Sequence, residues 1–253
     1  MAAHVVRDSL DPARAAALLT ALGRAPEGDV LPPFFHHLYF WEPVAPDGLG
    51  RDGHPKVGGL IPDMGLPRRM WAGGRLTFHA PLRAGQPAER ATQVITAERK
   101  EGRSGPLAFV TLQHQITQNG ALCVTEEQDL VYRADPDPSA PRPVPPEAPE
   151  GGAVRKVRFD STLLFRYSAL TFNGHRIHYD EAYAREVEGY DGLVVHGPLL
   201  AQLLMLEAGP LERFSFRATA PLMHHEAAIL CRDGAQMWVR GPDGRLCMRA
   251  ELS

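Results

Sequence analysis

HGPLLAQLLMLEA, residues His196 to Ala208, is the stretch that decides the fold. Its apolar residues occupy all sides of a helix rather than one stripe, which is typical of a helix buried inside a domain. Pro198 fits the first helical turn, where a missing N–H removes no hydrogen bond. The sequence therefore predicts a buried helix that begins near Gly197.

Strand-like runs accompany this helix. They are Val154–Phe159 before it and Arg213–Thr219, Glu226–Arg232, Gln236–Arg240 and Arg245–Glu251 after it. Pro242-Asp243-Gly244 marks a turn between the last two runs. A buried helix followed by an antiparallel meander predicts an α+β fold in which the sheet wraps around a central helix, the hot-dog arrangement.

The N-terminal half repeats this order with a weaker helix. A helical pattern at Pro12–Leu22 is followed by an irregular Pro/Gly-rich stretch at Leu31–Pro67. Strand-like runs come next, at Arg75–Pro81, Thr92–Lys100, Leu107–Gln118 and Ala121–Arg133. Asn119-Gly120 between the last two runs is a hairpin signal. We therefore expect a tandem (double) hot-dog.

The boundary between the halves is ADPDPSAPRPVPPEAPEGGA, Ala134 to Ala153. Proline is too dense there for a helix or a central strand. The alternative is a long surface loop within one large domain. We expect an N-terminal hot-dog domain at 1–133, a Pro-rich linker at 134–153 and a C-terminal catalytic hot-dog domain at 154–253, sizes that suit a chain of 253 residues.

Composition excludes several classes of function. Apolar residues make up 44% of the chain and the formal net charge is −3, without a basic stripe, so neither disorder nor nucleic-acid binding is expected. The three cysteines show no CxxC spacing, which favours a reducing cytoplasmic compartment over disulfides or zinc. No signal peptide or membrane-spanning run is recognisable, so we expect no membrane partner.

Chemistry is expected between SALTFNGHRIHYDEAYA, 168–184, and GYDGLVVHGPLL, 189–200. Adding water to a thioester-conjugated double bond needs proton transfer, a held water and a stabilised thioester oxyanion. Histidine titrates near neutrality, so His178 is the candidate acid/base. The Asn173 amide can hold the water, and the Gly197 N–H at a helix start can bind the oxyanion.

Other interpretations of this segment stay open. His175, His178 and Asp180 could ligate a metal, but no further ligand completes a familiar spacing, so we expect none. Asp180 also suits the N-cap of a short helix at 181–187. His196 either ends a strand or touches substrate.

The chain resembles the MaoC-like (hydratase-2) superfamily. Asn173–Asp180 and Val195–Pro198 resemble the hydratase-2 motif of R-specific enoyl-CoA hydratases. Further strings resemble mesaconyl-C4-CoA (3-methylfumaryl-CoA) and itaconyl-CoA hydratases and type 2 hydroxyacyl-thioester dehydratases: Asp52–Pro55, Leu66–Gly74, Arg103–Leu107 and Glu126–Asp129. The broader motif has aspartate where this chain has Asn173, and a proline-containing part is replaced at Arg176. Asn173 cannot act as a general base, so proton transfer falls more heavily on His178.

The resemblance implies a hydro-lyase with a double hot-dog fold, whose substrate is a 2-enoyl thioester. A C5 dicarboxylic acyl-CoA is favoured, mesaconyl-C4-CoA or itaconyl-CoA, hydrated to citramalyl-CoA. No cofactor is expected beyond the CoA or ACP carrier of the substrate. Arg68 or Arg69 would bind a carboxylate or a CoA phosphate. The candidate substrate-binding residues are Arg68, Arg69, Trp71, His196, Arg176 and Tyr167.

Three alternatives remain at this point. They are a 3-hydroxyacyl-ACP or -CoA dehydratase of fatty-acid metabolism, a hot-dog acyl-CoA thioesterase and a non-enzymatic acyl-CoA-binding module. An acyl carrier protein as partner and a homodimer also stay open.

Overall fold

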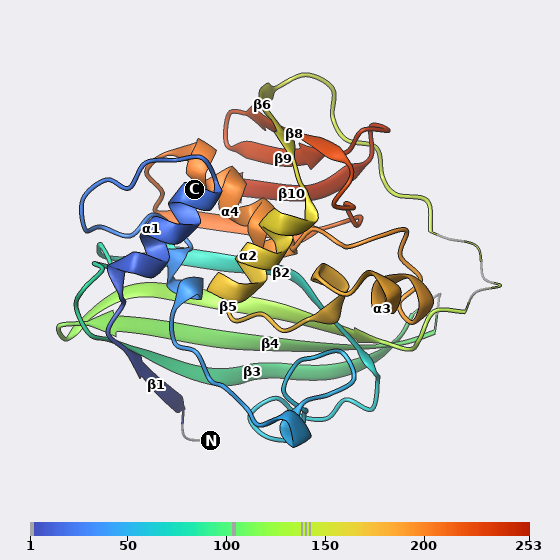
Figure 1. The fold of residues 1–253 in the computed structure, drawn as a ribbon, viewed down its shortest axis with the longest axis horizontal. Helices are drawn as coiled ribbons and strands as arrows, with labels where there is room; N and C mark the ends of the chain where they lie inside the picture. The colour runs from blue at the N-terminus through green and yellow to red at the C-terminus, as the bar shows by residue number, and fades with distance from the viewer. Residues whose placement is uncertain (1–2, 103–104, 138, 140, 142) are drawn as a thin grey trace.

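A computed structural model describes residues 3–102, 105–137, 139, 141 and 143–253. Arg103 and Ser104, which belong to one of the strings that resemble the family, lie outside the described residues. Within the described residues, ten strands form one antiparallel sheet (Figure 1). The strands are β1 His4–Asp8, β2 Arg68–Phe78, β3 Ala88–Gly102, β4 Gly105–Gln118, β5 Ala121–Arg133, β6 Ala153–Arg158, β7 Arg213–Ala218, β8 Ala227–Asp233, β9 Gln236–Arg240 and β10 Leu246–Leu252.

The helices lie against this sheet. They are α1 Pro12–Ala21, α2 Ser161–Leu170, α3 Glu181–Glu186 and α4 Gly197–Ala208, with short 3₁₀ turns η1 Phe35–Leu38, η2 Pro46–Gly48 and η3 Arg176–His178. No helix in the described part of the chain has the length and apolar character needed to cross a membrane.

The strand order is the same in both halves when each is followed from its outer edge inward. The sheet runs β1-β3-β4-β5-β2-β7-β10-β9-β8-β6, so β2 and β7 meet in the middle. Gly73 of β2 pairs with Arg217 of β7, and a Cβ at Gly73 would lie 2.5 Å from the Phe216 oxygen. Glycine at position 73 therefore lets the two half-sheets join closely.

Helix α4 is the central helix of the fold. Its residues are buried from Pro198 to Met205, and it contacts β2, β7, β9 and β10. The N-terminal half contributes helix α1 and the short turn η1. The Gln202 side chain donates to the Pro33 oxygen at 2.8 Å and ties the helix to that half. The predicted antiparallel sheet around a central helix is confirmed, and the helical pattern predicted at Pro12–Leu22 forms α1.

Some elements differ from the sequence-based expectation. Strand β2 begins at Arg68 rather than Arg75, because its first part pairs with the long strand β5. The short edge strand β1 and helix α2 were not predicted from the sequence.

The Pro-rich segment contains no helix or strand among its described residues between β5 and β6. It runs along the C-terminal half, where the Ala148 N–H donates to the Gly244 oxygen and the Leu246 N–H donates to the Pro146 oxygen. Residues 143–146 of this segment line the large cavity described below. Its predicted role as a linker between two domains stays a prediction.

Candidate active site

One cavity of about 1470 Å³ receives residues from both halves of the chain. The three predicted catalytic residues, Asn173, His178 and Gly197, all line it. Arg69 and Trp71 line it from the N-terminal half. The sheet and α4 therefore bring the expected acid/base, amide and main-chain donor to one space.

The segment after α2 positions the amide and the imidazole. Phe172 adopts a left-handed backbone, with φ of 51°, and turns the chain away from the helix. The Asn173 Oδ1 then accepts a hydrogen bond from the His175 N–H at 3.0 Å. His178 Nδ1 lies 2.7 Å from the Val194 oxygen, to which it donates. In the neutral ring this leaves Nε2 as the nitrogen that can accept a proton.

His178 is buried against a second histidine. The rings of His178 and His196 stack with centroids 3.6 Å apart and 20° between their planes. Burial lowers the pKa of His178 to about 3, although the hydrogen bond to the Val194 carbonyl raises it. The ring is therefore neutral at neutral pH and can act as a base.

His196 and Tyr167, two predicted substrate-binding residues, lie behind His178 and do not line the cavity. The His196 side chain is fully buried, and its Nε2 lies 2.8 Å from the Ser168 Oγ. The Tyr167 ring packs edge-on against the His196 ring, with centroids 4.8 Å apart. Both residues are placed to support the His178 imidazole rather than to line the cavity.

Gly197 opens α4 toward the cavity. His196 is the N-cap and makes no side-chain capping bond, and the first N–H of a helix has no helical acceptor. A Cβ at Gly197 would lie 3.6 Å from the Trp71 oxygen, so the main chain of β2 passes close by. The helix dipole places partial positive charge at this N–H, which suits an oxyanion.

The two predicted arginines differ in their surroundings. Arg68 pairs with the buried Glu188 carboxylate, and its guanidinium carbon lies 5.7 Å from the Tyr190 ring centroid. Arg69 makes no ion pair with any carboxylate among the described residues, and its charge opposes the rise that burial causes in the pKa of Tyr132. Arg69 is therefore the arginine available to an anionic substrate group.

Arg176 does not line the cavity. Its guanidinium pairs with Asp180 four residues later and stacks over the Tyr183 ring at 4.3 Å. Asp180 accepts from the Tyr183 N–H at 3.0 Å and caps α3 as predicted. Because its carboxylate is engaged by Arg176 and by the Tyr183 N–H, Asp180 does not join His175 and His178 in a metal site.

Sequence reasoning assigned no role to Asp52 and His54. His54 lines the cavity, and its Nδ1 lies 3.1 Å from the Asp52 Oδ2. The centroids of the His54 and His175 rings are 4.7 Å apart. The only sequence signal was the string Asp52-Gly-His54-Pro55, because a contact between the two halves is invisible in one sequence.

The loop that carries these two residues is pressed against the catalytic segment. The Arg176 N–H donates to the Asp52 oxygen at 2.9 Å. A Cβ at Gly53 would lie 2.1 Å from the Gly174 oxygen, and one at Gly174 would lie 2.6 Å from the Gly53 oxygen. Glycine at both positions permits this close backbone contact.

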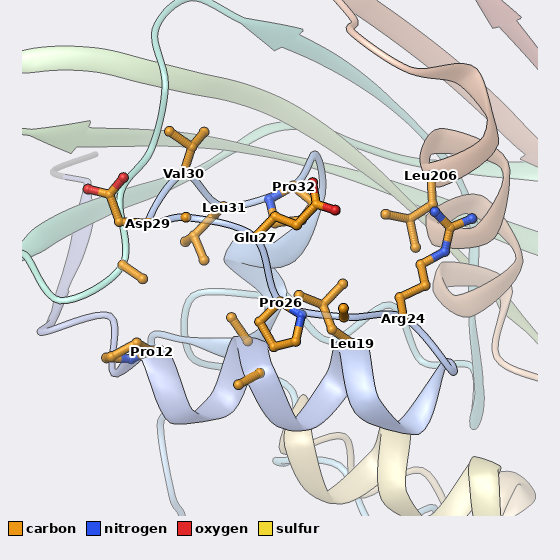
Figure 2. A pocket seen from close by; sticks show the side chains of 15 residues that line it. Pro12, Leu19, Arg24, Pro26, Glu27, Asp29, Val30, Leu31, Pro32 and Leu206 are labelled. Atoms are coloured by element: carbon orange, nitrogen blue, oxygen red, sulfur yellow. The ribbon is translucent and has the colours of Figure 1, made fainter.

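A second hollow, of about 450 Å³, lies along α1 and the loop after it (Figure 2). Leu19, Pro26 and Leu206 contribute to its wall, and Arg24 beside them pairs with Glu207. It contains none of the predicted site residues.

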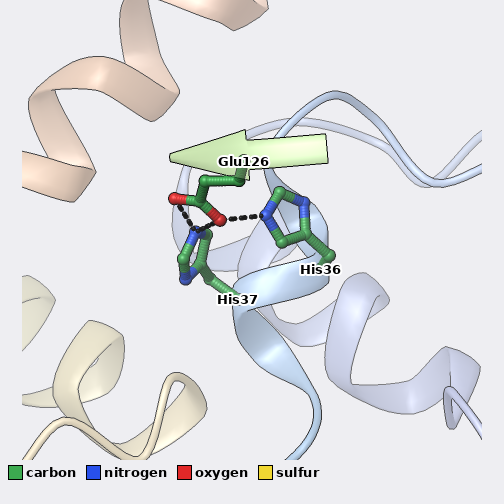
Figure 3. Close-up of side chains that lie close together, drawn as sticks. All are labelled: His36, His37 and Glu126. Carbon is green, nitrogen blue, oxygen red and sulfur yellow. Dashed lines mark hydrogen bonds and ion pairs between the residues drawn. The ribbon is translucent and has the colours of Figure 1, made fainter. Parts of the chain in front are cut away.

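Within the part of the chain that the structure describes, two groups of three side chains hold atoms that could ligate a metal within 4.8 Å of one another. One is Asp52, His54 and His175 beside the cavity. The other is buried in the N-terminal half, where Glu126 accepts from His36 at 2.8 Å and from His37 at 3.1 Å (Figure 3). The hydrogen bonds to Glu126 account for its burial without an ion.

Comparisons with known proteins agree with this geometry. The family model of hydroxyacyl-thioester dehydratase type 2 matches residues 34–224. Mesaconyl-C(4)-CoA hydratase of Chloroflexus aurantiacus is 49% identical over 94% of this chain and 89% of its own. The mitochondrial hydroxyacyl-thioester dehydratase type 2 of Schizosaccharomyces pombe is 27% identical over 83% of this chain and 80% of its own.

Solved structures show the same fold. HtdX of Mycobacterium tuberculosis superposes with a TM-score of 0.69 at 18% identity, covering 98% of this chain and 99% of that one. Another protein of that organism, reported as a double hot-dog, gives a TM-score of 0.59 at 13% identity, covering 100% and 95%. The fold is a double hot-dog, as predicted.

Fold and site together define a MaoC-like hydratase/dehydratase, a hydro-lyase. Within that class, the chain belongs to the hydroxyacyl-thioester dehydratase type 2 family.

Proposed function

We propose that this enzyme reversibly adds water to a C5 dicarboxylic 2-enoyl-CoA, with mesaconyl-C4-CoA as the favoured substrate and citramalyl-CoA as the product. The observation that carries the proposal is the convergence of His178, Asn173 and the Gly197 N–H on one cavity. The relative that is 49% identical is a mesaconyl-C(4)-CoA hydratase, which supports this substrate.

The proposed steps follow the geometry. The Asn173 amide holds the water beside the double bond, and the thioester oxygen lies against the Gly197 N–H. As the water oxygen bonds to the β-carbon, the π electrons of the double bond move toward the thioester oxygen. The Gly197 N–H and the helix dipole stabilise the negative charge that develops there. His178 transfers protons through Nε2, because its Nδ1 is held by the Val194 carbonyl.

Arg69 is the proposed partner of the free substrate carboxylate. In mesaconyl-C4-CoA that carboxylate is carried by the β-carbon, so its partner must lie near the point of water addition. Arg69 lines the cavity and carries no ion pair among the described residues, whereas Arg68 is held by Glu188. A bidentate guanidinium–carboxylate contact would also orient the double bond.

A second candidate is the dehydration of longer 3-hydroxyacyl thioesters, on ACP or CoA. The volume of about 1470 Å³ supports it, because a cavity of this size would admit a longer acyl chain. We favour the dicarboxylic substrate because Arg69 would lie unpaired beside an apolar chain.

We propose the cytoplasm as compartment and CoA rather than ACP as carrier. Cys123, Cys231 and Cys247 are free and buried, as a reducing compartment allows. A homodimer is compatible with the proposal, but the site does not require one because both halves of one chain build it.

The test is a substrate panel with the purified protein. Mesaconyl-C4-CoA, itaconyl-CoA, crotonyl-CoA and a long-chain 2-enoyl-CoA are followed by loss of the conjugated absorbance, and a thiol reagent is used in parallel. We expect the fastest turnover with mesaconyl-C4-CoA and no thiol release. A preference for the long chain would favour the second candidate, and thiol release without hydration would indicate a thioesterase.

A further inference from the structure

Asp52 and His54 form a carboxylate–imidazole pair, of which His54 lines the cavity and Asp52 is buried behind it. The Asp52 Oδ2 lies 3.1 Å from His54 Nδ1, and the Asp52 Oδ1 accepts from the His54 N–H at 3.1 Å. Both carboxylate oxygens thus fix one histidine. The hydrogen bond to Nδ1 leaves Nε2 as the ring nitrogen that can exchange a proton.

The charges around His54 come from three parts of the chain. Burial lowers its pKa, the hydrogen bond to Asp52 raises it, the Arg69 charge lowers it and the Asn173 side chain raises it by a further hydrogen bond. Burial raises the pKa of Asp52, but the hydrogen bond from His54 and the charges of His54 and Arg69 outweigh this and bring it to about 2. Asp52 is therefore ionised and can stabilise a protonated His54.

The other imidazole of the site has no such partner. His178 rests on the uncharged Val194 carbonyl and on the His196 ring. Position 173, which carries aspartate in the broader hydratase-2 motif, is an amide here. Among the cavity-facing histidines of this cluster, the ionised carboxylate therefore belongs to His54.

The histidine rings of the site form a row with different groups at its two ends. Imidazole rings follow one another from His54 to His175 at 4.7 Å and from His175 to His178 at 5.4 Å between centroids. Arg69 adjoins the His54 end, and the His196-Gly197 start of α4 adjoins the His178 end. A thioester oxygen at Gly197 and a carboxylate at Arg69 would place the α-carbon nearer His178 and the β-carbon nearer His54.

We propose that His54, oriented by Asp52, is a second catalytic acid/base of the hydration site, and that it serves the water at the β-carbon. The proposal rests on the proposed function and names two residues of the N-terminal half for that reaction. His178 then serves the α-carbon.

The proton balance is closed by the two rings. The pair carries one proton beyond those of two neutral imidazoles. In the resting site this proton lies on His54 beside Asp52, because burial keeps His178 neutral, and it passes to His178 Nε2 before the addition. In hydration, His178 gives this proton to the α-carbon, while His54 takes one from the water as its oxygen bonds to the β-carbon. Dehydration runs the same steps backward, and nothing is oxidised or reduced.

One proton transfer from His54 to His178 restores the state from which the addition begins. His175 lies between the two rings, and its Nε2 is buried without a hydrogen-bond partner among the described residues. That nitrogen is free to take part in the return of the proton.

Two measurements on the full-length protein separate the roles. His54→Gln is expected to lower kcat for mesaconyl-C4-CoA hydration by ~10²–10³-fold, the lower part of the range of general acid–base catalysis. It should still exchange the α-hydrogens of citramalyl-CoA in D₂O, seen by NMR, because His178 remains. His178→Gln should lose both reactions. His79→Gln, at an exposed histidine hydrogen-bonded to Thr125, is the matched control and should keep both.

Asp52→Asn tests the positioning role of the carboxylate. It should lower kcat more than KM and move the pH–rate limb that belongs to His54 toward lower pH, because protonated His54 loses its anionic partner while Arg69 and His175 still face it. Circular dichroism and thermal unfolding establish that each variant is folded. A pH profile unchanged from wild type would contradict the role of Asp52.

Three outcomes would overturn the proposal. Wild-type kcat in folded His54→Gln would do so while leaving the proposed function intact. Loss of activity on chelation, restored by zinc, would assign Asp52, His54 and His175 to a metal instead. A wild-type enzyme inactive on every thioester of the panel would overturn the proposed function and this inference together.

Discussion

The imidazoles of His178 and His196 stack face to face, with 3.6 Å between their centroids and 20° between their planes. His196 is fixed on its far side by Ser168 and Tyr167. The His196 ring therefore packs against one face of the His178 ring, while the Val194 carbonyl accepts a hydrogen bond from its Nδ1. Residues outside the cavity set the position of the group inside it.

Removing the supporting ring should slow the reaction without weakening binding. We expect His196→Ala to lower kcat by ~10–100-fold with little change in KM, because a misplaced catalytic group loses reactive geometry. His196→Phe keeps a ring face and should recover much of the rate. Steady-state kinetics on folded variants measure this, and a wild-type kcat in His196→Ala would contradict the supporting role.

Substitutions of the two neighbouring arginines should have different effects: loss of Arg69 should weaken substrate binding, and loss of Arg68 should lower the stability of the fold. Arg69→Met is expected to raise KM for mesaconyl-C4-CoA by ~10–100-fold, since a charged hydrogen bond contributes about 1.5–3 kcal/mol. It should leave kcat/KM for crotonyl-CoA, which has no second carboxylate, almost unchanged. Equal losses on both substrates would show that Arg69 does not select the carboxylate.

Arg68→Met is the matched comparison. The side chains of Arg68 and Glu188 are only 12% and 4% exposed, so the variant leaves a buried carboxylate without its partner. We expect the free energy of unfolding to fall by about 3–5 kcal/mol, measured by denaturant titration. A variant as stable as wild type would contradict the structural role of this ion pair.

Acid should destabilise the fold through its buried neutral histidines. Burial lowers the pKa of His36 and of His114 to about 4, so the folded chain stays neutral where the unfolded chain gains protons. Their contribution to stability is complete above pH 6.5 and is lost as the pH falls toward 4. For each proton that the unfolded chain binds in excess of the folded chain, the free energy of unfolding changes by about 1.4 kcal/mol per pH unit.

His114→Gln should therefore flatten the decline of unfolding free energy between pH 6.5 and 4 by about one proton, whereas His79→Gln should not. Denaturant unfolding at several pH values measures the slope. The same slope in His114→Gln as in wild type would contradict the assignment.

Much of the fold could be predicted because its signals are local. The all-round apolar pattern of Gly197–Ala208 gave the central helix, and alternation gave most of the strands. The strand β1 is too short to show a clear alternation of apolar and polar residues. The first part of β2 was hidden because its glycines serve the junction with β7, a contact that no local pattern encodes.

The site was predictable only where its residues lie close in sequence. Asn173, His178 and Gly197 belong to two strings and line the same cavity. His196 and Arg176 were predicted to bind substrate because they lie close to the motif in sequence, but neither lines the cavity. His196 is buried behind His178, and Arg176 pairs with Asp180. His54 could not be found in this way, because only the folded chain brings it to the catalytic segment.

The central claim is that His178 carries protons in the hydration of an enoyl thioester. Its most direct test is kcat for mesaconyl-C4-CoA hydration in wild type and in folded His178→Gln, followed by loss of the conjugated absorbance. We expect turnover by wild type and a loss of ~10²–10⁴-fold in the variant. Equal kcat values in the two proteins would contradict it.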